Sequence, residues 1–231
     1  MTAPNEPLPF PADWASMLVL VPHPDDPEYG IAAAVAKWTA AGKRVRYALA
    51  SRGERGIAGM DPQQAGPLRE AEQRRAAAIV GVDPVAGVEF WDFPDSNIVN
   101  TPALRAKIAS VIAHVRPDVV VAVYGAPEFG PGMPNQRDHI EFAAAVTDAW
   151  DAMASTPRWL FQGGPGPSHV EDVDAYLDTA VESLAAHEVY LSVLDPATAV
   201  GEQARKVVDM TTSALPGRRL AGFRLIRSAE A

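Results

Sequence analysis

An imidazole and two carboxylates stand close together directly after an apolar run near the start of the chain. The run, Met17–Pro22, has no charged or hydrogen-bonding side chain, and His23, Asp25 and Asp26 follow it. Hydrolytic zinc sites use three histidine or carboxylate ligands and leave a fourth position for water. His23 and Asp26 are near enough on a tight turn to bind one ion, which would lower the pKa of a bound water from about 15.7 to about 7.

Asp25 is not needed as a ligand in this arrangement. A free carboxylate beside the ion can accept the proton of the attacking water and pass it to a leaving amine. The turn alone has an equally good structural explanation, because Asp25, Asp26 and Glu28 are residues of the kind that cap a helix and complement its dipole. Capping does not explain His23, nor a second Asp-His pair at residues 138 and 139.

The third ligand is expected at His139. Asp118–Tyr124 is a continuous, mostly β-branched run, which is typical of a central parallel strand. The glycine- and proline-rich loop Gly125–Gln136 follows it, and a helix is predicted from Arg137 to about Met153. His139 therefore also lies near a helix start beyond the end of a strand.

Strands and helices alternate along the chain, which predicts an α/β fold. The helix after the first strand is expected from about Glu28 to Ala41, since Pro27 suits a first helical turn. A glycine-rich loop is expected at Arg52–Pro67. Further strands are predicted at Arg44–Ser51, Val88–Phe93, Arg158–Phe161 and, at an edge, Gly222–Ile226; further helices are predicted at Leu68–Val80, Pro102–Val115 and Asp174–Tyr190. The pattern indicates a mostly parallel sheet in three layers, with the flagged turns gathered at one edge.

Length, charge and cysteine content limit the class of protein. The 231 residues suit one domain over residues 14–231, after a flexible, proline-rich tail over residues 1–13. A net charge of −9 argues against nucleic-acid binding, and the absence of cysteine excludes disulfides and thiolate zinc ligands. Without a signal peptide or a membrane span, we expect a cytoplasmic protein with a small-molecule substrate; a homo-oligomer is left open.

Several motifs occur in an order that resembles a known family. They are His-Pro-Asp-Asp-Pro-Glu at 23–28, Ser-Arg-Gly-Glu at 51–54, Arg-Glu-Ala-Glu at 69–72, Pro-Asp-Val-Val at 117–120 and Asp-His at 138–139. Together they resemble the PIG-L/LmbE-like family of zinc-dependent deacetylases over residues 17–150, with a looser echo in Ala-Ala-His at 185–187. The resemblance implies a Rossmann-like fold and removal of an acyl group from an amine, often on an N-acetylglucosamine moiety.

The resemblance also implies roles for individual residues. His23, Asp26 and His139 would be the zinc ligands, and Asp25 the general base. Arg69 resembles the family's substrate-contacting arginine, although an ordinary solvated arginine on a helix explains it equally well.

Gln136 departs from the family's pattern. Many members have a histidine three positions before the last ligand, proposed to stabilise an oxyanion or protonate the leaving group. A neutral amide can donate a hydrogen bond to an oxyanion, but it cannot act as a general acid. Gln136, His187 and Asp95, which lies in a polar turn at a predicted strand end, are expected to contact the substrate. His187 and His169 are candidates for the missing imidazole, although an ordinary histidine is the commoner explanation of each.

Three functional hypotheses follow. The first is a zinc hydrolase that removes an N-acyl group from an amino sugar or a natural-product intermediate. The second keeps the metal and replaces amide hydrolysis with water addition to an unsaturated carboxylate, for which Gln136 leaves room. The third is a metal-free module that binds a sugar or nucleotide in the same crevice.

Overall fold

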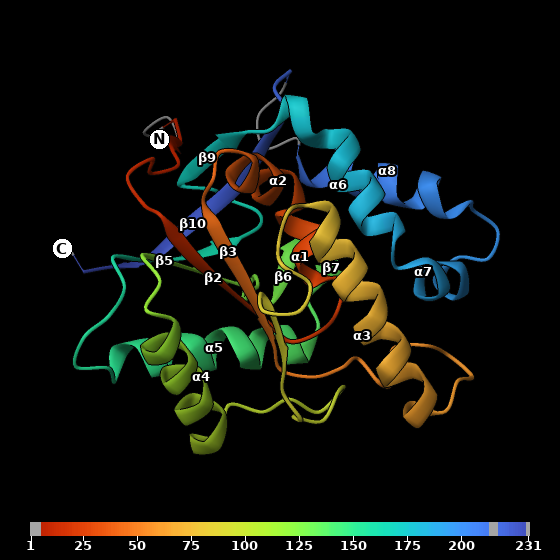
Figure 1. Ribbon diagram of the computed structural model, residues 1–231, viewed down its shortest axis with the longest axis horizontal. Coiled ribbons are helices and arrows are strands. Elements are labelled where there is room, and N and C mark those ends of the chain that lie inside the picture. The colour runs from red at the N-terminus through yellow and green to blue at the C-terminus, as the bar shows by residue number, and fades with distance from the viewer. Residues whose placement is uncertain (1–5, 213–216, 230–231) are drawn as a thin grey trace.

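A sheet of eight strands runs through the protein, with helices on both faces (Figure 1). The computed structural model describes residues 6–212 and 217–229. The strands of the sheet are β1 Leu8–Pro9, β2 Ser16–Val21, β3 Arg44–Leu49, β4 Val88–Phe90, β5 Val119–Ala122, β8 Trp159–Gly163, β9 His169–Asp172 and β10 Leu220–Ser228. Their order is β1-β9-β10-β8-β5-β2-β3-β4, and a separate hairpin pairs β6 Glu128–Gly130 with β7 Met133–Pro134.

The helices complete a three-layer arrangement. They are α1 Asp26–Gly30, α2 Ala32–Ala40, α3 Pro62–Ile79, α4 Pro102–Val115, α5 Arg137–Asp151, α6 Leu177–Ala185, α7 Glu188–Leu194 and α8 Val200–Thr211, with the short 3-10 helix η1 at Asp174–Tyr176. α4 and α5 lie on one side of the sheet, and α2, α6 and α8 lie on the other (Figure 1). The α/β fold with a mostly parallel sheet is confirmed.

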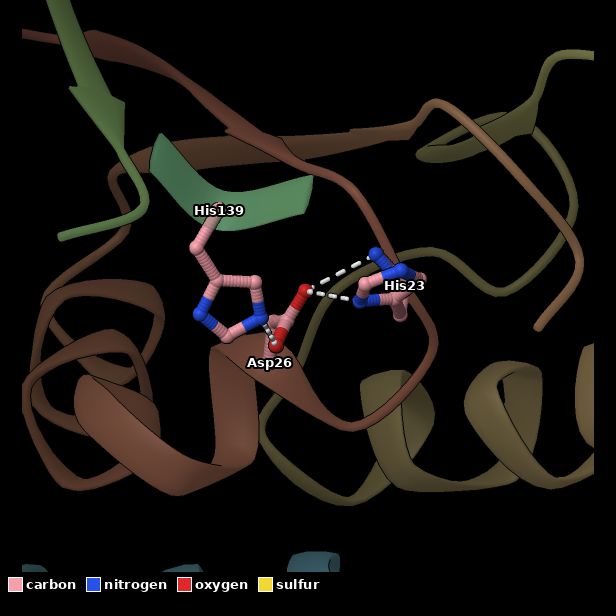
Figure 2. A group of neighbouring side chains, drawn as sticks. All are labelled: His23, Asp26 and His139. Atoms are coloured by element: carbon pink, nitrogen blue, oxygen red, sulfur yellow. Dashed lines mark hydrogen bonds and ion pairs between the residues drawn. The ribbon is translucent and has the colours of Figure 1, made fainter. Parts of the chain in front are cut away.

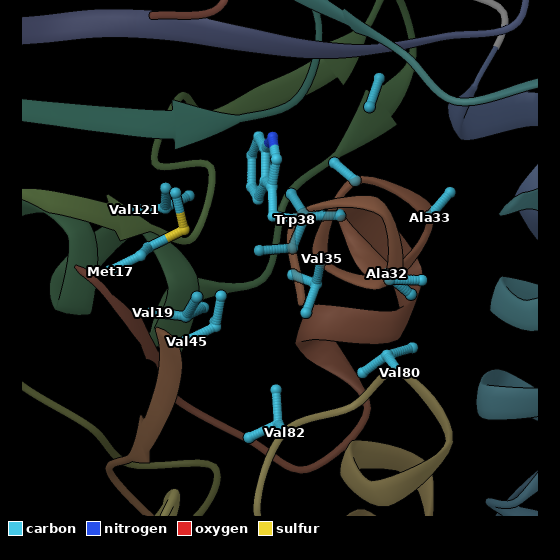
Figure 3. Packing of buried hydrophobic residues seen from close by; sticks show 14 of the residues in the cluster. Met17, Val19, Ala32, Ala33, Val35, Trp38, Val45, Val80, Val82 and Val121 are labelled. Carbon is cyan, nitrogen blue, oxygen red and sulfur yellow. The ribbon is translucent and has the colours of Figure 1, made fainter. Parts of the chain in front are cut away.

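Strand β2 is buried on both faces. Odd-numbered residues such as Val19 pack in the cluster that contains Val35 and Trp38 of α2 (Figure 3). Even-numbered residues such as Leu20 pack instead with α4 and α5, where Phe142 is fully buried. Because side chains alternate between the faces of a strand, a continuous apolar run is what a strand between two helical layers requires.

The chain changes direction across the sheet at β2. This strand is parallel to both of its neighbours, β3 and β5. From β2 the chain moves outward to β3 and β4, and it later crosses to β5 and β8 on the other side. Loops that leave neighbouring strands in opposite directions open a crevice at their carboxyl ends. Residues 23–26 follow β2 and residues 135–139 follow β5, so both motifs lie at this crevice.

Several predicted helix boundaries are corrected. The helix expected from Glu28 to Ala41 begins at Asp26 and breaks at Ile31, directly after the poor helix former Gly30. The helix predicted at Asp174–Tyr190 is likewise divided, between α6 and α7.

Helix α3 starts earlier than the sequence pattern indicated. It begins at Pro62, because the side chain of Asp61 caps it by accepting the N–H of Gln63 at 2.8 Å. Pro67, placed in the preceding loop by the sequence analysis, lies inside the helix.

The first and last strands, β1 and β10, both pair with β9. β10 was predicted as an edge strand, but it lies between β8 and β9 and is antiparallel to both. β1 pairs with β9, and the side chain of Phe10 is buried against Trp38 and Phe223, with ring centroids 4.8 Å apart in each case. Residues 8–10 therefore correct the prediction of a flexible tail; residues 1–5 lie outside the described residues. The prediction of one domain over residues 14–231 stays a prediction.

No helix in the described part of the chain has both the length and the apolar character needed to cross a bilayer.

We predict that Phe10→Ala lowers the free energy of unfolding by about 3–5 kcal/mol, since it removes a buried ring at the junction of β1 with the core. Leu8→Ala, at a side chain that is 61% exposed, is the matched control and should change stability by less than about 0.5 kcal/mol. Denaturant unfolding of the two variants measures both values. Equal stabilities would contradict the placement of Phe10 in the core.

Candidate metal and active site

Two histidines and an aspartate from two turns converge at the crevice (Figure 2). The Nε2 atom of His139 lies 3.1 Å from Oδ1 of Asp26, and Nδ1 of His23 lies 3.6 Å from Oδ2 of the same carboxylate. The two imidazole rings are 5.5 Å apart between centroids. All three side chains are less than 10% exposed. The structure thus brings together the three residues that the sequence analysis selected as ligands.

The local fold holds each of these side chains in place. Beyond β2, the carbonyl of Pro22 accepts a hydrogen bond from Ser51 Oγ, and the backbone N–H of His23 donates to Asp26 at 2.8 Å. His139 lies in the first turn of α5, where its Nδ1 is 3.0 Å from the side-chain oxygen of Asn135. This contact leaves Nε2 of His139 directed at Asp26.

The donor set fits a zinc ion. Nε2 of His139 is buried and has the carboxylate of Asp26 3.1 Å away, a pairing of imidazole nitrogen and carboxylate oxygen that zinc sites use. Ligand atoms in a tetrahedral zinc site are about 3.4 Å apart; here each imidazole nitrogen is 3.1 or 3.6 Å from a different oxygen of Asp26, and one ligand atom from each residue lies within 4.8 Å of the others. His23, Asp26 and His139 could therefore hold the ion.

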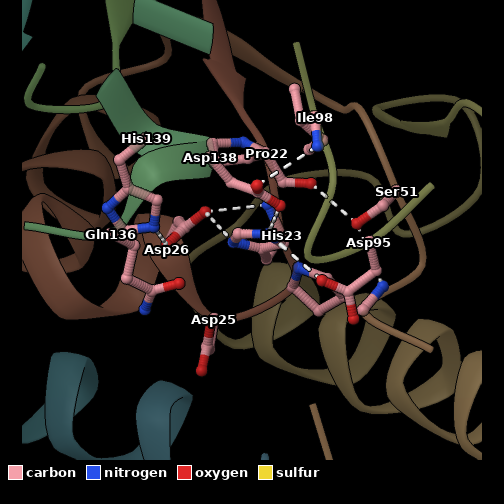
Figure 4. Close-up of polar contacts among 12 residues, drawn as sticks. Pro22, His23, Asp25, Asp26, Ser51, Asp95, Ile98, Gln136, Asp138 and His139 are labelled. Atoms are coloured by element: carbon pink, nitrogen blue, oxygen red, sulfur yellow. Dashed lines mark hydrogen bonds and ion pairs between the residues drawn. The ribbon is translucent and has the colours of Figure 1, made fainter. Parts of the chain in front are cut away.

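A second group of possible ligands shares His23. Its Nε2 atom lies 3.1 Å from Asp138 and 3.3 Å from Asp95, both buried (Figure 4). Asp138 also accepts the backbone N–H of Ile98, and Asp95 accepts that of Arg55. Because a metal-bound histidine commonly donates its other N–H to a carboxylate, the two groups can form one assembly in which Nδ1 of His23 faces the ion and Nε2 faces the carboxylates.

The electrostatics of the cluster favour a cation. Burial opposes the charged form of His23, but hydrogen bonds to Asp138, Asp26 and Asp95 outweigh it and raise the pKa of His23 well above its usual value. Burial also opposes ionisation of Asp26, yet the imidazoles of His139 and His23 hold the pKa of Asp26 well below its usual value. The surroundings therefore stabilise both a negative carboxylate and a positive charge next to it.

Asp25 lies beside the cluster, but its carboxylate is not one of the possible ligands grouped there. Its backbone has φ 81 and ψ −25, a left-handed conformation that costs a residue other than glycine about 1–2 kcal/mol. Burial raises the pKa of Asp25 to about 6, although the guanidinium of Arg69 opposes the rise. A carboxyl group with a pKa near neutrality can both accept and release a proton under physiological conditions.

Arg69 is buried at 3% exposure, so the interpretation as a solvated helix arginine is wrong. Its guanidinium donates to the carbonyls of Pro24 and Gly53, lies 3.3 Å from Asp25 Oδ2 and stacks 4.3 Å over the ring of Tyr190. The side chain therefore clamps the turn that carries Asp25. A contact with substrate stays a prediction.

The other predicted site residues have different surroundings. Asp95 is buried against His23 and Arg55, which makes it a support of the cluster in this structure, and its predicted contact with substrate is untested. Gln136 is the exposed N-cap residue of α5, and Figure 4 shows its amide below Asp26, on the side of the view where Asp25 is drawn.

Neither candidate for a replacement imidazole joins the cluster. His187 is fully buried, and its Nε2 lies 3.3 Å from Glu28. Burial raises the pKa of Glu28 to about 8 and lowers that of His187 to about 4. His169 lies on β9, where its ring meets Phe161 edge-on and its Nδ1 contacts Ser168.

Three supporting residues were not predicted from the sequence. Asp138 was seen only as the neighbour of His139, and Asn135 precedes His139 by one helical turn, a spacing that could have indicated a contact. Gln73, whose oxygen accepts the N–H of Asp25 at 2.8 Å, carries no comparable signal in the sequence.

Comparison with known proteins identifies the family. A family model described as PIG-L: GlcNAc-PI de-N-acetylase matches residues 18–150. The chain belongs to this family. The family suggested by the ordered motifs is thereby confirmed.

Relatives of this PIG-L family member include named enzymes. The probable N-acetyl-alpha-D-glucosaminyl L-malate deacetylase 2 of Bacillus anthracis is 27% identical over 187 residues, which cover 74% of this chain and 79% of that protein. The N,N'-diacetylchitobiose deacetylase of Pyrococcus horikoshii superposes with a TM-score of 0.73 at 16% identity, over 93% of this chain and 84% of that one. The 4-carboxy-2-hydroxymuconate hydratase of Pseudomonas putida KT2440 superposes with a TM-score of 0.67 at 20% identity, over 92% and 96%. Likeness at these structural identities shows a shared fold.

We predict that Asp138→Asn lowers zinc affinity about 10- to 100-fold, because an amide nitrogen would face the N–H of His23 while the amide oxygen still accepts from Ile98. Asp148→Asn, on the same helix with a side chain 55% exposed, should bind zinc as the unmodified protein does. Competition with a chelator measures both affinities. Equal affinity in the two variants would show that Asp138 does not support the ligand His23.

Proposed function

We propose that this PIG-L family member is a zinc-dependent deacetylase that hydrolyses the N-acetyl group of an amino-sugar or natural-product substrate. The observation that carries the proposal is the buried group of His23, Asp26 and His139, whose possible ligand atoms lie close together, with a separate carboxylate, Asp25, beside it. Family membership and the deacetylase of Bacillus anthracis support the reaction class.

His23, Asp26 and His139 would hold the ion. When bound, zinc lowers the pKa of water to about 7 and polarises a carbonyl oxygen. Asp25 accepts the proton of the attacking water, and Arg69, 3.3 Å from Asp25 Oδ2, keeps that carboxylate oriented. Asp138 and Asp95 hold the His23 ring by its far nitrogen.

Protonation of the leaving amine also falls to Asp25. Gln136 has no proton to give as an acid, and neither His169 nor His187 reaches the cluster. The amide of Gln136 can instead donate a hydrogen bond to a developing oxyanion. In this proposal Asp25 therefore takes up a proton in the first half of the reaction and releases it in the second.

Net charge bears on the kind of partner that the protein binds. A net charge of −9 supports a small-molecule substrate rather than nucleic acid, and we propose that the protein acts in the cytoplasm, with a homo-oligomer left open.

A second candidate function is hydration of an unsaturated carboxylate. The observation that favours it is Gln136, since adding water to a double bond requires no protonation of a leaving amine. A hydratase with the same fold is consistent with this alternative.

We predict different defects for the two adjacent aspartates. Asp25→Ala should bind zinc normally and lose about 10²- to 10⁴-fold in kcat, since it removes the general base. Asp26→Ala and His139→Ala should lose the metal itself. Elemental analysis together with turnover measures both properties, and equal zinc content in all three variants would refute the ligand assignment.

A substrate screen separates the proposed functions. N-acetylated amino sugars and unsaturated carboxylates are supplied to protein purified without chelator, with amine release and loss of the double bond as readouts. We expect amine release alone. Hydration without amine release would select the second function, and protein without zinc that still binds sugars or nucleotides would select a metal-free binding module.

A further inference from the structure

A buried hydrogen bond reaches the backbone of the catalytic turn from helix α3. Gln73 is fully buried, and its side-chain oxygen accepts the N–H of Asp25 at 2.8 Å. Asp25 has the left-handed backbone conformation, with φ 81. A conformation that this residue type rarely adopts persists only when its surroundings enforce it. The bond from Gln73 acts at the residue that needs such support.

Glu28 fixes the direction of the Gln73 amide. The amide nitrogen donates to both carboxyl oxygens of Glu28, at 3.1 Å each. A flipped amide would place its NH₂ group against the N–H of Asp25 and its oxygen against the carboxyl group. Only one orientation of Gln73 satisfies both neighbours, and it presents an acceptor to Asp25.

The far end of this network is anchored where α7 begins. Nε2 of His187, the N-cap residue of α7, lies 3.3 Å from Oε2 of Glu28, and both side chains have no exposed surface. Glu72, next to Gln73, accepts the N–H of Val189 at 2.7 Å. The start of α7 is therefore tied to α3 through Glu72 and to α1 through Glu28, which in turn holds the Gln73 amide.

Helix α3 supports Asp25 at two atoms. Residues 69 and 73 are four apart and so lie on the same face of the helix. Arg69 lies 3.3 Å from the carboxylate of Asp25, while Gln73 accepts from its backbone N–H. The contact with Arg69 orients the Asp25 side chain, and the contact with Gln73 holds the Asp25 backbone.

We propose that Gln73 is a positioning residue, which keeps Asp25 in its left-handed conformation and thereby aims the Asp25 carboxylate at the attacking water. This inference rests on the proposed function, because it takes Asp25 as the base. Gln73 does not touch substrate, since it is fully buried and its amide is engaged at both ends.

The test replaces Gln73 with a residue of similar shape that cannot accept or donate a hydrogen bond. Gln73→Met should lower kcat about 10²-fold, the effect of a misplacement of about 1 Å, with KM and zinc content unchanged. In an Asp25→Ala background the same change should cause no further loss, because two residues that act as one unit are not additive. Full additivity of the two losses would overturn the proposal.

Gln203→Met is the matched control. Gln203 is also a buried glutamine on a helix, and its amide nitrogen donates to the carbonyls of Leu191, Asp195 and Thr198. This variant should lose thermal stability and keep kcat. If kcat falls in both variants in proportion to stability, the role of Gln73 is structural only. Gln73→Asn, whose amide is one methylene too short to reach Asp25, replaces Gln73→Met if the latter does not fold, with the same expected outcome.

A structural readout keeps this inference separate from the proposed function. Failure of the unmodified protein to release amine from any N-acetylated substrate would refute the deacetylase proposal alone. A crystal structure of the Gln73 variant loaded with zinc should show Asp25 outside the left-handed region and its carboxylate displaced. An unchanged Asp25 in that structure would overturn the role of Gln73, whatever the reaction.

Discussion

The site contains four buried carboxylates, and the surrounding residues must compensate for the loss of their contact with water. Asp25, Asp26, Asp95 and Asp138 all lie almost fully buried at one edge of the sheet. An unpaired buried ion costs several kcal/mol, so each carboxylate needs an imidazole, a guanidinium or a backbone N–H. His23 and His139 supply the imidazoles, Arg69 of α3 supplies the guanidinium, and the loops after β3 and β4 supply backbone N–H groups from Arg55 and Ile98. His23, which contacts three of the four carboxylates, is the residue on which this balance depends.

The sequence predicted what depends on local pattern. The apolar run of β2 and the turn that follows it were placed correctly, and alternation of strands and helices was enough to bring His139 to the same crevice. The supporting contacts could not be predicted, because they join segments far apart: Asp25 and Gln73 are separated by 48 positions, and His23 and Asp138 by 115. Nothing in the residue type of Gln73 indicates which backbone group it will meet.

The errors in the predicted fold have related causes. Helix periodicity continues through Ile31 and through residues 186–187. Gly30 is a local signal for the first break, whereas the second depends on packing that a single segment does not reveal. The residues of a strand likewise do not indicate which strands it pairs with, which is why β10 was predicted at an edge. Phe10 lies between two prolines in the sequence, which gave no sign that it is buried. Its burial depends on Trp38 and Phe223 from elsewhere in the chain. Asp61 before Pro62 was a further local signal that was not used in the prediction.

The position of β10 has a consequence for how the protein acquires its structure. In the sheet, β9 is bonded to β10 and β1 but not to β8. Strands β1 and β9 are therefore attached to the rest of the sheet through β10. A chain leaving the ribosome can assemble β2, β3 and β5 early, but β1 and Phe10 have no completed surface to join until residues 220–228 have emerged. Pairing across such sequence separation is slow, and the waiting strands are exposed to aggregation meanwhile. Correct attachment of β1 and β9 therefore depends on residues 220–228.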